Sequence, residues 1–146
     1  MFRQSWSHAY AAIIPPLHLE TMITRRGVDW WKSSLRSGES VLVLELAGGV
    51  HGYATAGAAR TRGRYRGEIY ELYIEPTHQG LGFGEQLFES CRQRLDERGL
   101  DGLIVWALSD NTRATDFYWR RGGRPVARAF DRFGGRKLEK IAFAWD

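Results

Sequence analysis

Apolar residues recur at mainly three- and four-residue steps from Trp6 to Leu35, a spacing that is typical of short amphipathic helices. Pro15, Pro16 and Gly27 divide this region, because proline breaks a helix interior and glycine weakens one. The pattern therefore predicts two helices at the start of the chain.

The pattern then changes to one that is typical of strands. Val41 to Leu46 reads VLVLEL, and the turn Ala47-Gly48-Gly49 joins it to a second strand from Val50 to about Ala59, so that the two form a hairpin. A third strand is predicted from Glu68 to Glu75 (EIYELYIE), because β-branched and aromatic residues dominate it, and Pro76 ends it.

The second half of the chain returns to mixed periodicity. Apolar residues on one helical face, a nearly all-apolar run (LIVWAL) and two strand-like tails joined by Gly134-Gly135 follow in order. The predicted elements are a helix over 84–98, a strand over 103–108, a helix from 110 or 111 to 121 and strands over 125–131 and 138–145.

These elements predict an α/β fold. A strand, a helix and a strand in succession imply a parallel pair with a right-handed crossover, whereas the hairpins are antiparallel. We therefore expect a mixed, mostly antiparallel sheet with a central parallel βαβ unit flanked by helices. A length of 146 residues suits a single domain over 1–146.

Composition narrows the classes of function. The formal charge of +4 is too mild and too evenly spread to indicate nucleic-acid binding, and no apolar stretch approaches the roughly 20 residues of a membrane span. The single Cys91 favours a reducing, cytoplasmic compartment. The four histidines show no metal-ligand spacing, so that each is expected to be a surface or packing residue and no metal is implied (His8, His18, His51 and His78).

A glycine-rich segment, LYIEPTHQGLGFG from Leu72 to Gly84, joins the third strand to the next helix. Gly80, Gly82 and Gly84 let the backbone turn tightly and let its N–H groups approach a ligand. The helix start adds further unpaired N–H groups and the positive end of its dipole, which suit a pyrophosphate. The segment predicts an anion site, although a tight connection alone would also explain the glycines.

Two other nucleotide motifs do not fit this segment. A Walker loop needs Lys followed by Ser or Thr after its last glycine, where this chain has Glu85-Gln86. The Rossmann pattern needs G-x-G-x-x-G and an acidic residue on the next strand, whereas the spacing here is G-x-G-x-G and the next strand is LIVWAL.

The stretch from Gln79 to Gly84 resembles the Q/R-x-x-G-x-G/A signature of the GNAT acyltransferase superfamily. Asn111 to Gly122 resembles the second signature of that superfamily, N-x-x-A-x-x-F-Y-x-x-x-G, and SWSHAYAAIIP is similar to the first helices of one branch. The resemblance covers nearly the whole chain. Because members begin with a strand and only Met1 to Gln4 precede the first helix here, we expect that strand to be missing or very short.

The resemblance implies that acetyl-coenzyme A is the acetyl donor and that the glycine loop holds its pyrophosphate. The backbone N–H of Ile74 would stabilise the developing oxyanion. Asn111 would combine helix capping with a polar contact near the cofactor arm. The cofactor-binding residues implied in this way are Leu72, Ile74, Gln79, Gly80, Leu81, Gly82, Phe83, Gly84, Asn111, Phe117 and Tyr118.

Attack on a thioester requires a neutral amine, whereas an amine with a pKa of about 10.4 is mostly protonated at pH 7. The resemblance implies Glu68 as the base, and Glu71 is the alternative, either as base or as an anchor for a cationic substrate. A regular strand would place these two carboxylates on opposite faces of the sheet, and a bulge would place them on the same face. Tyr118 is the expected general acid for the leaving thiolate, although an aromatic helix face packed in the core would also explain it.

The leading hypothesis is therefore an N-acetyltransferase that acts directly on a primary amine of a small molecule or peptide. Cys91 lies on the core face of its helix, so that an acyl-enzyme intermediate is not expected. The alternative is a non-catalytic acyl-coenzyme A binding or sensing module. The sheet edge left by a short N-terminus would favour a homodimer.

Overall fold

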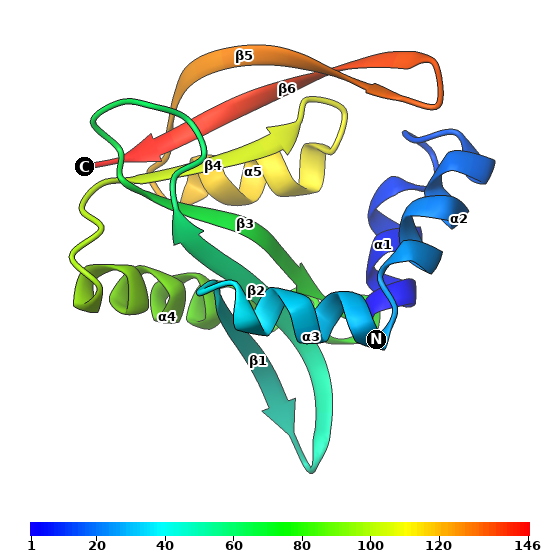
Figure 1. The fold of residues 1–146 in the computed structure, drawn as a ribbon, viewed down its shortest axis with the longest axis horizontal. Coiled ribbons are helices and arrows are strands. Elements are labelled where there is room, and N and C mark those ends of the chain that lie inside the picture. Colours follow the sequence, from blue (N-terminus) through cyan, green and yellow to red (C-terminus); the bar gives the residue numbers. More distant parts are fainter.

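The computed structural model describes residues 1–146, which form a six-stranded sheet with helices on both of its faces (Figure 1). The helices are α1 (Phe2–Tyr10), α2 (Pro16–Arg25), α3 (Val28–Arg36), the short 3-10 helix η1 (Pro76–His78), α4 (Phe83–Glu97) and α5 (Thr112–Arg120). The strands are β1 (Ser40–Leu46), β2 (Gly49–Ala58), β3 (Gly67–Ile74), β4 (Leu103–Leu108), β5 (Arg124–Phe133) and β6 (Arg136–Trp145).

The N-terminal region holds three helices, so the expectation of two was wrong. Pro16 begins α2, a position where its missing N–H costs nothing. Gly27 takes an extended conformation (φ −78°, ψ −172°) and serves as the N-cap of α3. The glycine therefore separates two helices that the apolar spacing alone does not distinguish.

The strand order is β1-β2-β3-β4-β6-β5, and every neighbouring pair is antiparallel except β3 and β4. This arrangement confirms the predicted mixed sheet with one parallel βαβ unit. No strand precedes α1 within residues 1–146, so β1 forms one edge of the sheet. The C-terminal hairpin is longer than predicted, because its pairing continues to Phe133 and Arg136.

Two apolar clusters hold the helices on opposite faces of the sheet. The larger joins α4 and α5 to one face through side chains that include Phe88, Ile69 and Phe143. The smaller joins α1 and α2 to the other face around Trp6 and Leu138. No helix is long and apolar enough to cross a membrane.

The parallel pair is short. β3 and β4 pair only through Gly67 with Leu103 and Glu68 with Ile104. Beyond these residues the two strands diverge, and β3 runs toward α1 while β4 stays beside β6 (Figure 1). The sheet is therefore open between β3 and β4 on the side where both strands end.

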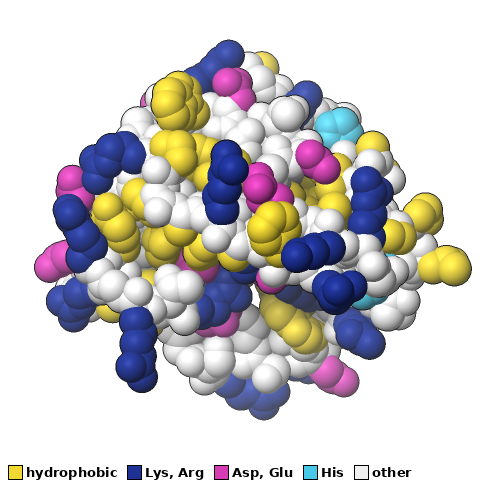
Figure 2. All heavy atoms as spheres, turned by 90° about the horizontal axis from the view of Figure 1, so that it is seen from above, with side chains coloured by type: hydrophobic (Ala, Val, Ile, Leu, Met, Phe, Trp, Pro, Cys, Tyr) yellow, Lys and Arg dark blue, Asp and Glu magenta, His cyan; other side chains and the backbone are white.

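The β5–β6 hairpin covers the end of the molecule seen in Figure 2. On that face Lys and Arg side chains are scattered among hydrophobic ones and are not gathered into a single patch. Val126 and Phe130 of the edge strand β5 are 43% and 54% exposed.

Candidate active site

The glycine loop needs its glycines for two different reasons. Gly80 and Gly82 have positive φ angles of +77° and +86°, a left-handed conformation that other residues rarely adopt, yet a Cβ atom there would meet nothing within 4 Å. At Gly84 a Cβ atom would lie 3.1 Å from the Phe117 ring. The first two glycines therefore set the backbone path, and the third allows α5 to pack against the loop.

The backbone amides of this loop are free. The N–H groups of residues 80–85 donate to no protein acceptor, and no side chain caps α4, whose N-cap is Gly82. Helix starts leave such N–H groups unsatisfied, and the helix dipole makes that end positive. The loop therefore presents several aligned donors that suit an anionic group.

Gln79 fixes the start of the loop against β3. Its Nε2 donates to the carbonyl of Ile74 at 2.9 Å, while its buried Oε1 has no partner. The N–H of Glu75 donates to the carbonyl of His51 on β2 at 2.8 Å. Because adjacent residues of a strand direct their N–H groups to opposite sides, the N–H of Ile74 faces the opening between β3 and β4.

The second sequence motif forms α5 and contacts the first. Asn111 caps α5 by accepting a hydrogen bond from the Ala114 N–H at 3.3 Å, as expected. Phe117 lies over Gly84, and Arg121 forms an ion pair with Glu85 at 3.6 Å. Two segments about thirty residues apart in the chain thus form one continuous surface.

Tyr118 projects from α5 into the larger apolar cluster and is 5% exposed. Its ring packs against Phe88, Phe143 and Trp145, and no hydrogen bond of the structure involves its hydroxyl group. Burial raises the pKa of this phenol well above its ordinary value. The hydroxyl group therefore stays protonated at neutral pH, and the ring has the aromatic core packing that the sequence analysis gave as the alternative explanation of Tyr118.

A bulge arranges three glutamates on one face of the sheet. Thr55 pairs with Glu71 and Ala56 with Ile69, so that Tyr70 is an extra residue in β3. The bulge brings Glu68 to the face that already carries Glu71 and Glu75. We call these three side chains the carboxylate row, and it lies on the side of the sheet that α1 and α2 cover.

Glu68 stands at the far end of the row. It is 1% exposed and accepts hydrogen bonds from the Arg60 backbone N–H at 2.9 Å and the Arg60 guanidinium at 2.7 Å. It lies six residues before Ile74, or roughly 20 Å along a strand. The structure therefore does not bring Glu68 to the glycine loop.

Glu71 stands in the middle of the row within an aromatic surrounding. It accepts hydrogen bonds from the Tyr53 hydroxyl at 2.7 Å and the Arg26 guanidinium at 2.5 Å, and its side chain is 10% exposed. The guanidinium also lies 3.8 Å from the centre of the Trp30 ring. Burial and the Glu71 charge raise the pKa of Tyr53 well above its ordinary value, so Tyr53 remains a donor.

Trp31 packs edge-on against Tyr53, with ring centres 5.2 Å apart, and against Phe2. Next to this contact the hydroxyl groups of Tyr10 and Tyr73 form a short hydrogen bond. Adjacent Trp30 and Trp31 thus play different packing roles, as their neighbouring positions on a helix require.

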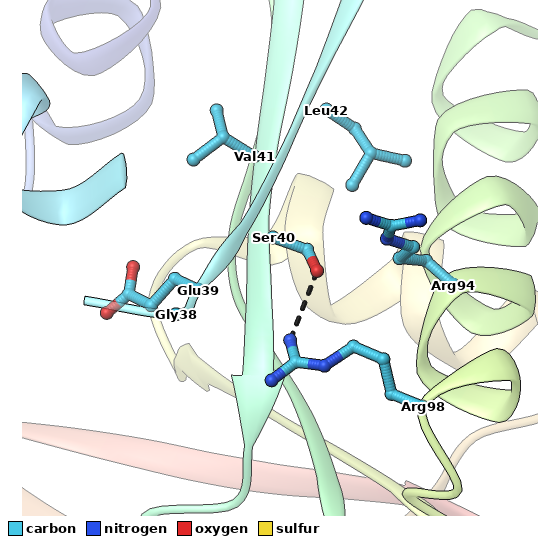
Figure 3. Close-up of a pocket in the computed structure, with 7 residues that line it drawn as sticks. All are labelled: Gly38, Glu39, Ser40, Val41, Leu42, Arg94 and Arg98. Carbon is cyan, nitrogen blue, oxygen red and sulfur yellow. Dashed lines mark hydrogen bonds between the residues drawn. The ribbon is translucent and has the colours of Figure 1, made fainter. Parts of the chain in front are cut away.

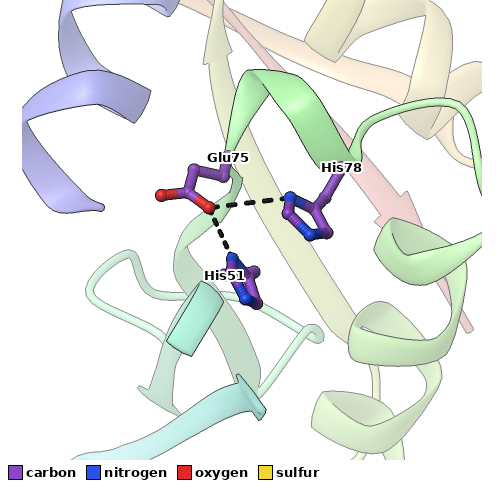
Figure 4. A group of neighbouring side chains, drawn as sticks. All are labelled: His51, Glu75 and His78. Carbon is purple, nitrogen blue, oxygen red and sulfur yellow. Dashed lines mark hydrogen bonds and ion pairs between the residues drawn. The ribbon is translucent and has the colours of Figure 1, made fainter. Parts of the chain in front are cut away.

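At the near end of the row the sequence analysis missed a cluster. His51 contacts Glu75 (Nδ1 to Oε2, 2.6 Å), and the His78 ring stacks on the His51 ring with centres 4.0 Å apart (Figure 4). The two histidines are far apart in the chain and meet because β2 pairs with β3. Only the register of β2 against β3, which the sequence analysis did not predict, could have indicated the contact between His51 and Glu75.

A separate pocket of about 440 Å³ lies at the other end of α4. The start of β1, Arg94 of α4 and Arg98, which directly follows α4, bound it, and Arg98 donates to the Ser40 hydroxyl at 3.1 Å (Figure 3). A helix of this length separates the pocket from the glycine loop by about 20 Å.

Known proteins share this arrangement. Residues 3–123 match the model of the acetyltransferase (GNAT) family, and the chain therefore belongs to that family. YuaI, an uncharacterized N-acetyltransferase of Bacillus subtilis (strain 168), is 29% identical over 143 residues, which cover 97% of this chain and 81% of that protein.

One further relative is similar in part of its sequence, and one solved structure is similar in fold. A mycothiol acetyltransferase of Nocardia farcinica is 39% identical over 60 residues, which span 41% of this chain and 20% of that longer protein. The PaiA N-acetyltransferase of Thermoplasma acidophilum, solved in complex with coenzyme A, has a TM-score of 0.72 at 16% identity and covers 95% of this chain and 86% of its own. The PaiA structure therefore shows that the two proteins share a fold.

Proposed function

We propose that the protein transfers an acetyl group from acetyl-coenzyme A to a primary amine of a small molecule or peptide. The observation that carries this proposal is the set of free backbone amides at residues 80–85. These residues lead into a helix beside the opening in the sheet. The coenzyme A complex of PaiA, which has the same fold, supports the choice of donor.

In this proposal the pyrophosphate binds the amides of the glycine loop. The pantetheine arm enters the opening between β3 and β4, next to Leu72, Ile74 and Phe117 of the larger apolar cluster. Gln79 holds the loop through its hydrogen bond to the Ile74 carbonyl, and Phe83 holds it by packing against the larger apolar cluster. Asn111 fixes the start of α5.

The amine nitrogen attacks the thioester carbonyl carbon, and the Ile74 N–H stabilises the resulting oxyanion. The C–S bond then breaks, and Tyr118 donates a proton to the thiolate that leaves. The proton lost by the amine passes to a carboxylate of the row. We assign this role to Glu71, which is three residues nearer to Ile74 than Glu68 is.

The hydrogen-bond partners of Glu71 leave its carboxylate able to accept a proton. Arg26 donates to Oε1 and the Tyr53 hydroxyl donates to Oε2, and each carboxylate oxygen retains a second acceptor position. Glu68 instead holds Arg60 at the start of the loop that joins β2 to β3.

A thiol-release assay over classes of amines, combined with calorimetric titration of coenzyme A, tests the proposal. At least one class should release free coenzyme A, and Tyr118→Phe should lower turnover while changing the coenzyme A affinity by less than about threefold. Near-equal loss of both would argue against the acid role. Coenzyme A binding without thiol release from any amine would instead identify a non-catalytic module.

We also propose that two copies associate through β1. This edge strand has no neighbour on one side, and Val43 at its centre is 54% exposed. Antiparallel pairing of two copies of β1 about Val43 would extend the sheet. Light scattering that shows a monomer at high protein concentration would contradict this assembly.

A further inference from the structure

Three side chains with metal-binding atoms converge beside the glycine loop. His51 comes from the start of β2, Glu75 directly follows β3 and His78 ends η1, and the three side chains face one another (Figure 4). Their ligand atoms all lie within 4.8 Å of one another. We propose that His51, Glu75 and His78 bind one divalent transition-metal ion of the zinc class.

The distances suit such an ion. Glu75 Oε2 lies 2.6 Å from His51 Nδ1 and 3.6 Å from His78 Nδ1. Tetrahedral ligands at 2.0–2.2 Å from zinc lie about 3.3 Å from one another. These two distances fall on either side of this value, and the third pair, between the two histidines, lies within 4.8 Å.

One ring must turn for both histidines to coordinate. The rings are stacked at 4.0 Å with an angle of 21° between their planes, whereas a bound ion lies in the plane of each ring. His78 can turn, because its closest hydrogen bond is to the hydroxyl of the neighbouring Thr77 at 2.8 Å. The Thr77 hydroxyl group, once released from the His78 ring, can form a hydrogen bond with a water ligand of the ion.

The charge and accessibility of the cluster are also suitable. Glu75 supplies a carboxylate oxygen, a negatively charged ligand atom, beside the two imidazoles. The side chains of His51, Glu75 and His78 are 26%, 15% and 26% exposed, which leaves one open side for the ion and a water molecule. Two imidazoles favour zinc, cobalt or nickel over magnesium or calcium, which prefer oxygen ligands.

A bound ion would fasten both ends of the turn that leads into the glycine loop. Glu75 follows Ile74, and His78 precedes Gln79, whose side chain already bonds to the Ile74 carbonyl. The ion would therefore link β2, β3 and η1. This inference does not depend on acetyl transfer, because metal binding can be measured without any substrate.

The test uses protein without a polyhistidine tag, stripped of metal with a chelator. Titration with Zn²⁺ in a calorimeter should show one ion per chain, and Zn²⁺ should raise the melting temperature, because the ion binds the folded state. Co²⁺ should give visible absorption bands that Zn²⁺ abolishes. Mg²⁺ should do neither, and saturable Mg²⁺ binding without Zn²⁺ binding would overturn the proposal.

Variants locate the ion. His51→Ala, His78→Ala and Glu75→Gln should each weaken Zn²⁺ binding by at least about tenfold. His8→Ala is the matched control, since His8 is exposed and has no partner, and it should bind Zn²⁺ as the parent does. If His51→Ala does not fold, as judged by its metal-free melting curve, His78→Ala decides, because it leaves the shorter contact between His51 and Glu75 in place. Full Zn²⁺ affinity in His78→Ala, or a loss in His8→Ala, would refute the site.

Discussion

The carboxylate row runs along β3 and the glycine loop follows the end of that strand, and the two regions satisfy their polar groups in opposite ways. In the loop, backbone amides at residues 80–85 have no protein acceptor, and no side chain caps the helix. In the row, each of Glu68, Glu71 and Glu75 has a basic partner, from Arg60, Arg26 and His51 respectively. One region keeps its donors for a ligand, whereas the other uses its charges to hold the chain together.

This contrast predicts that removing the basic partner of a carboxylate in the row lowers the stability of the fold. The largest effect on stability should come from Arg26→Ala, because it leaves the 10% exposed Glu71 carboxylate without its cation. Breaking such a mostly buried pair should lower the free energy of unfolding by about 3 kcal/mol. Urea denaturation measures this change.

Arg3→Ala is the matched control, because the Arg3–Glu20 pair has side chains that are 58% and 57% exposed. Exposed pairs contribute little, so this variant should lose less than about 1 kcal/mol. Equal losses in the two variants would show that Arg26 does not stabilise the fold through Glu71.

Two glycines of the loop should be sensitive to substitution for different reasons, Gly84 because of the size of the new side chain and Gly80 because of its backbone conformation. Gly84→Ala should cost about 1–3 kcal/mol and weaken coenzyme A binding, because the new Cβ atom meets the Phe117 ring at 3.1 Å. Gly80→Ala should cost about 1–2 kcal/mol through its positive φ alone. Thermal melts and calorimetry measure the two effects.

Phe117→Leu separates these causes. Combined with Gly84→Ala it should recover part of the lost stability, since the smaller side chain leaves room for the methyl group. Combined with Gly80→Ala it should recover nothing. The same recovery in both double variants would disprove the distinction between the two glycines.

A smaller effect concerns acid sensitivity. The folded-state pKa of Glu75 lies below its ordinary value of 4.5, so the carboxylate stabilises the protein above that pH and loses its contribution as pH falls through the lowered pKa. Glu75→Gln should therefore lose less stability than the parent between about pH 6 and about pH 3. Urea midpoints over this range measure the difference, and identical pH profiles would contradict it.

Leu81→Ala should have the smallest effect. The Leu81 side chain is 65% exposed, and the loop is proposed to bind through its backbone. Stability should change by less than about 0.5 kcal/mol, and coenzyme A affinity should stay within about threefold. A tenfold loss of affinity, seen by calorimetry, would show that this side chain contacts the ligand.

The sequence predicted the loop region better than the row for a physical reason. Glycines with positive φ, a helix start and the Asn111 cap are local features, so short stretches of sequence determine them. The cation that pairs with Glu71, Arg26, is 45 residues away in the bend between α2 and α3, whose packing no periodicity specifies. Local patterns likewise left the third N-terminal helix undetected, since Gly27 acts as a cap only when the chain turns there.

The predicted catalytic residues differ in the same way, because some of their positions depend on local sequence and others on strand pairing. Tyr118 lies on the expected helix, and its neighbour Phe117 touches the glycine loop. Glu68 and Glu71 share a face because of the bulge, one of the two possibilities that the sequence left open. Which carboxylate accepts a proton stays a prediction.

The extra residue in β3 has a consequence for comparing this chain with its relatives. Because Tyr70 shifts the strand by one position, residues before and after it follow different alternation rules. A relative that lacks one residue there would direct its counterpart of Glu68 to the opposite face, even if all its other residues aligned with this chain. Equivalence of acidic residues across the family should therefore be judged from strand pairing and not from aligned columns.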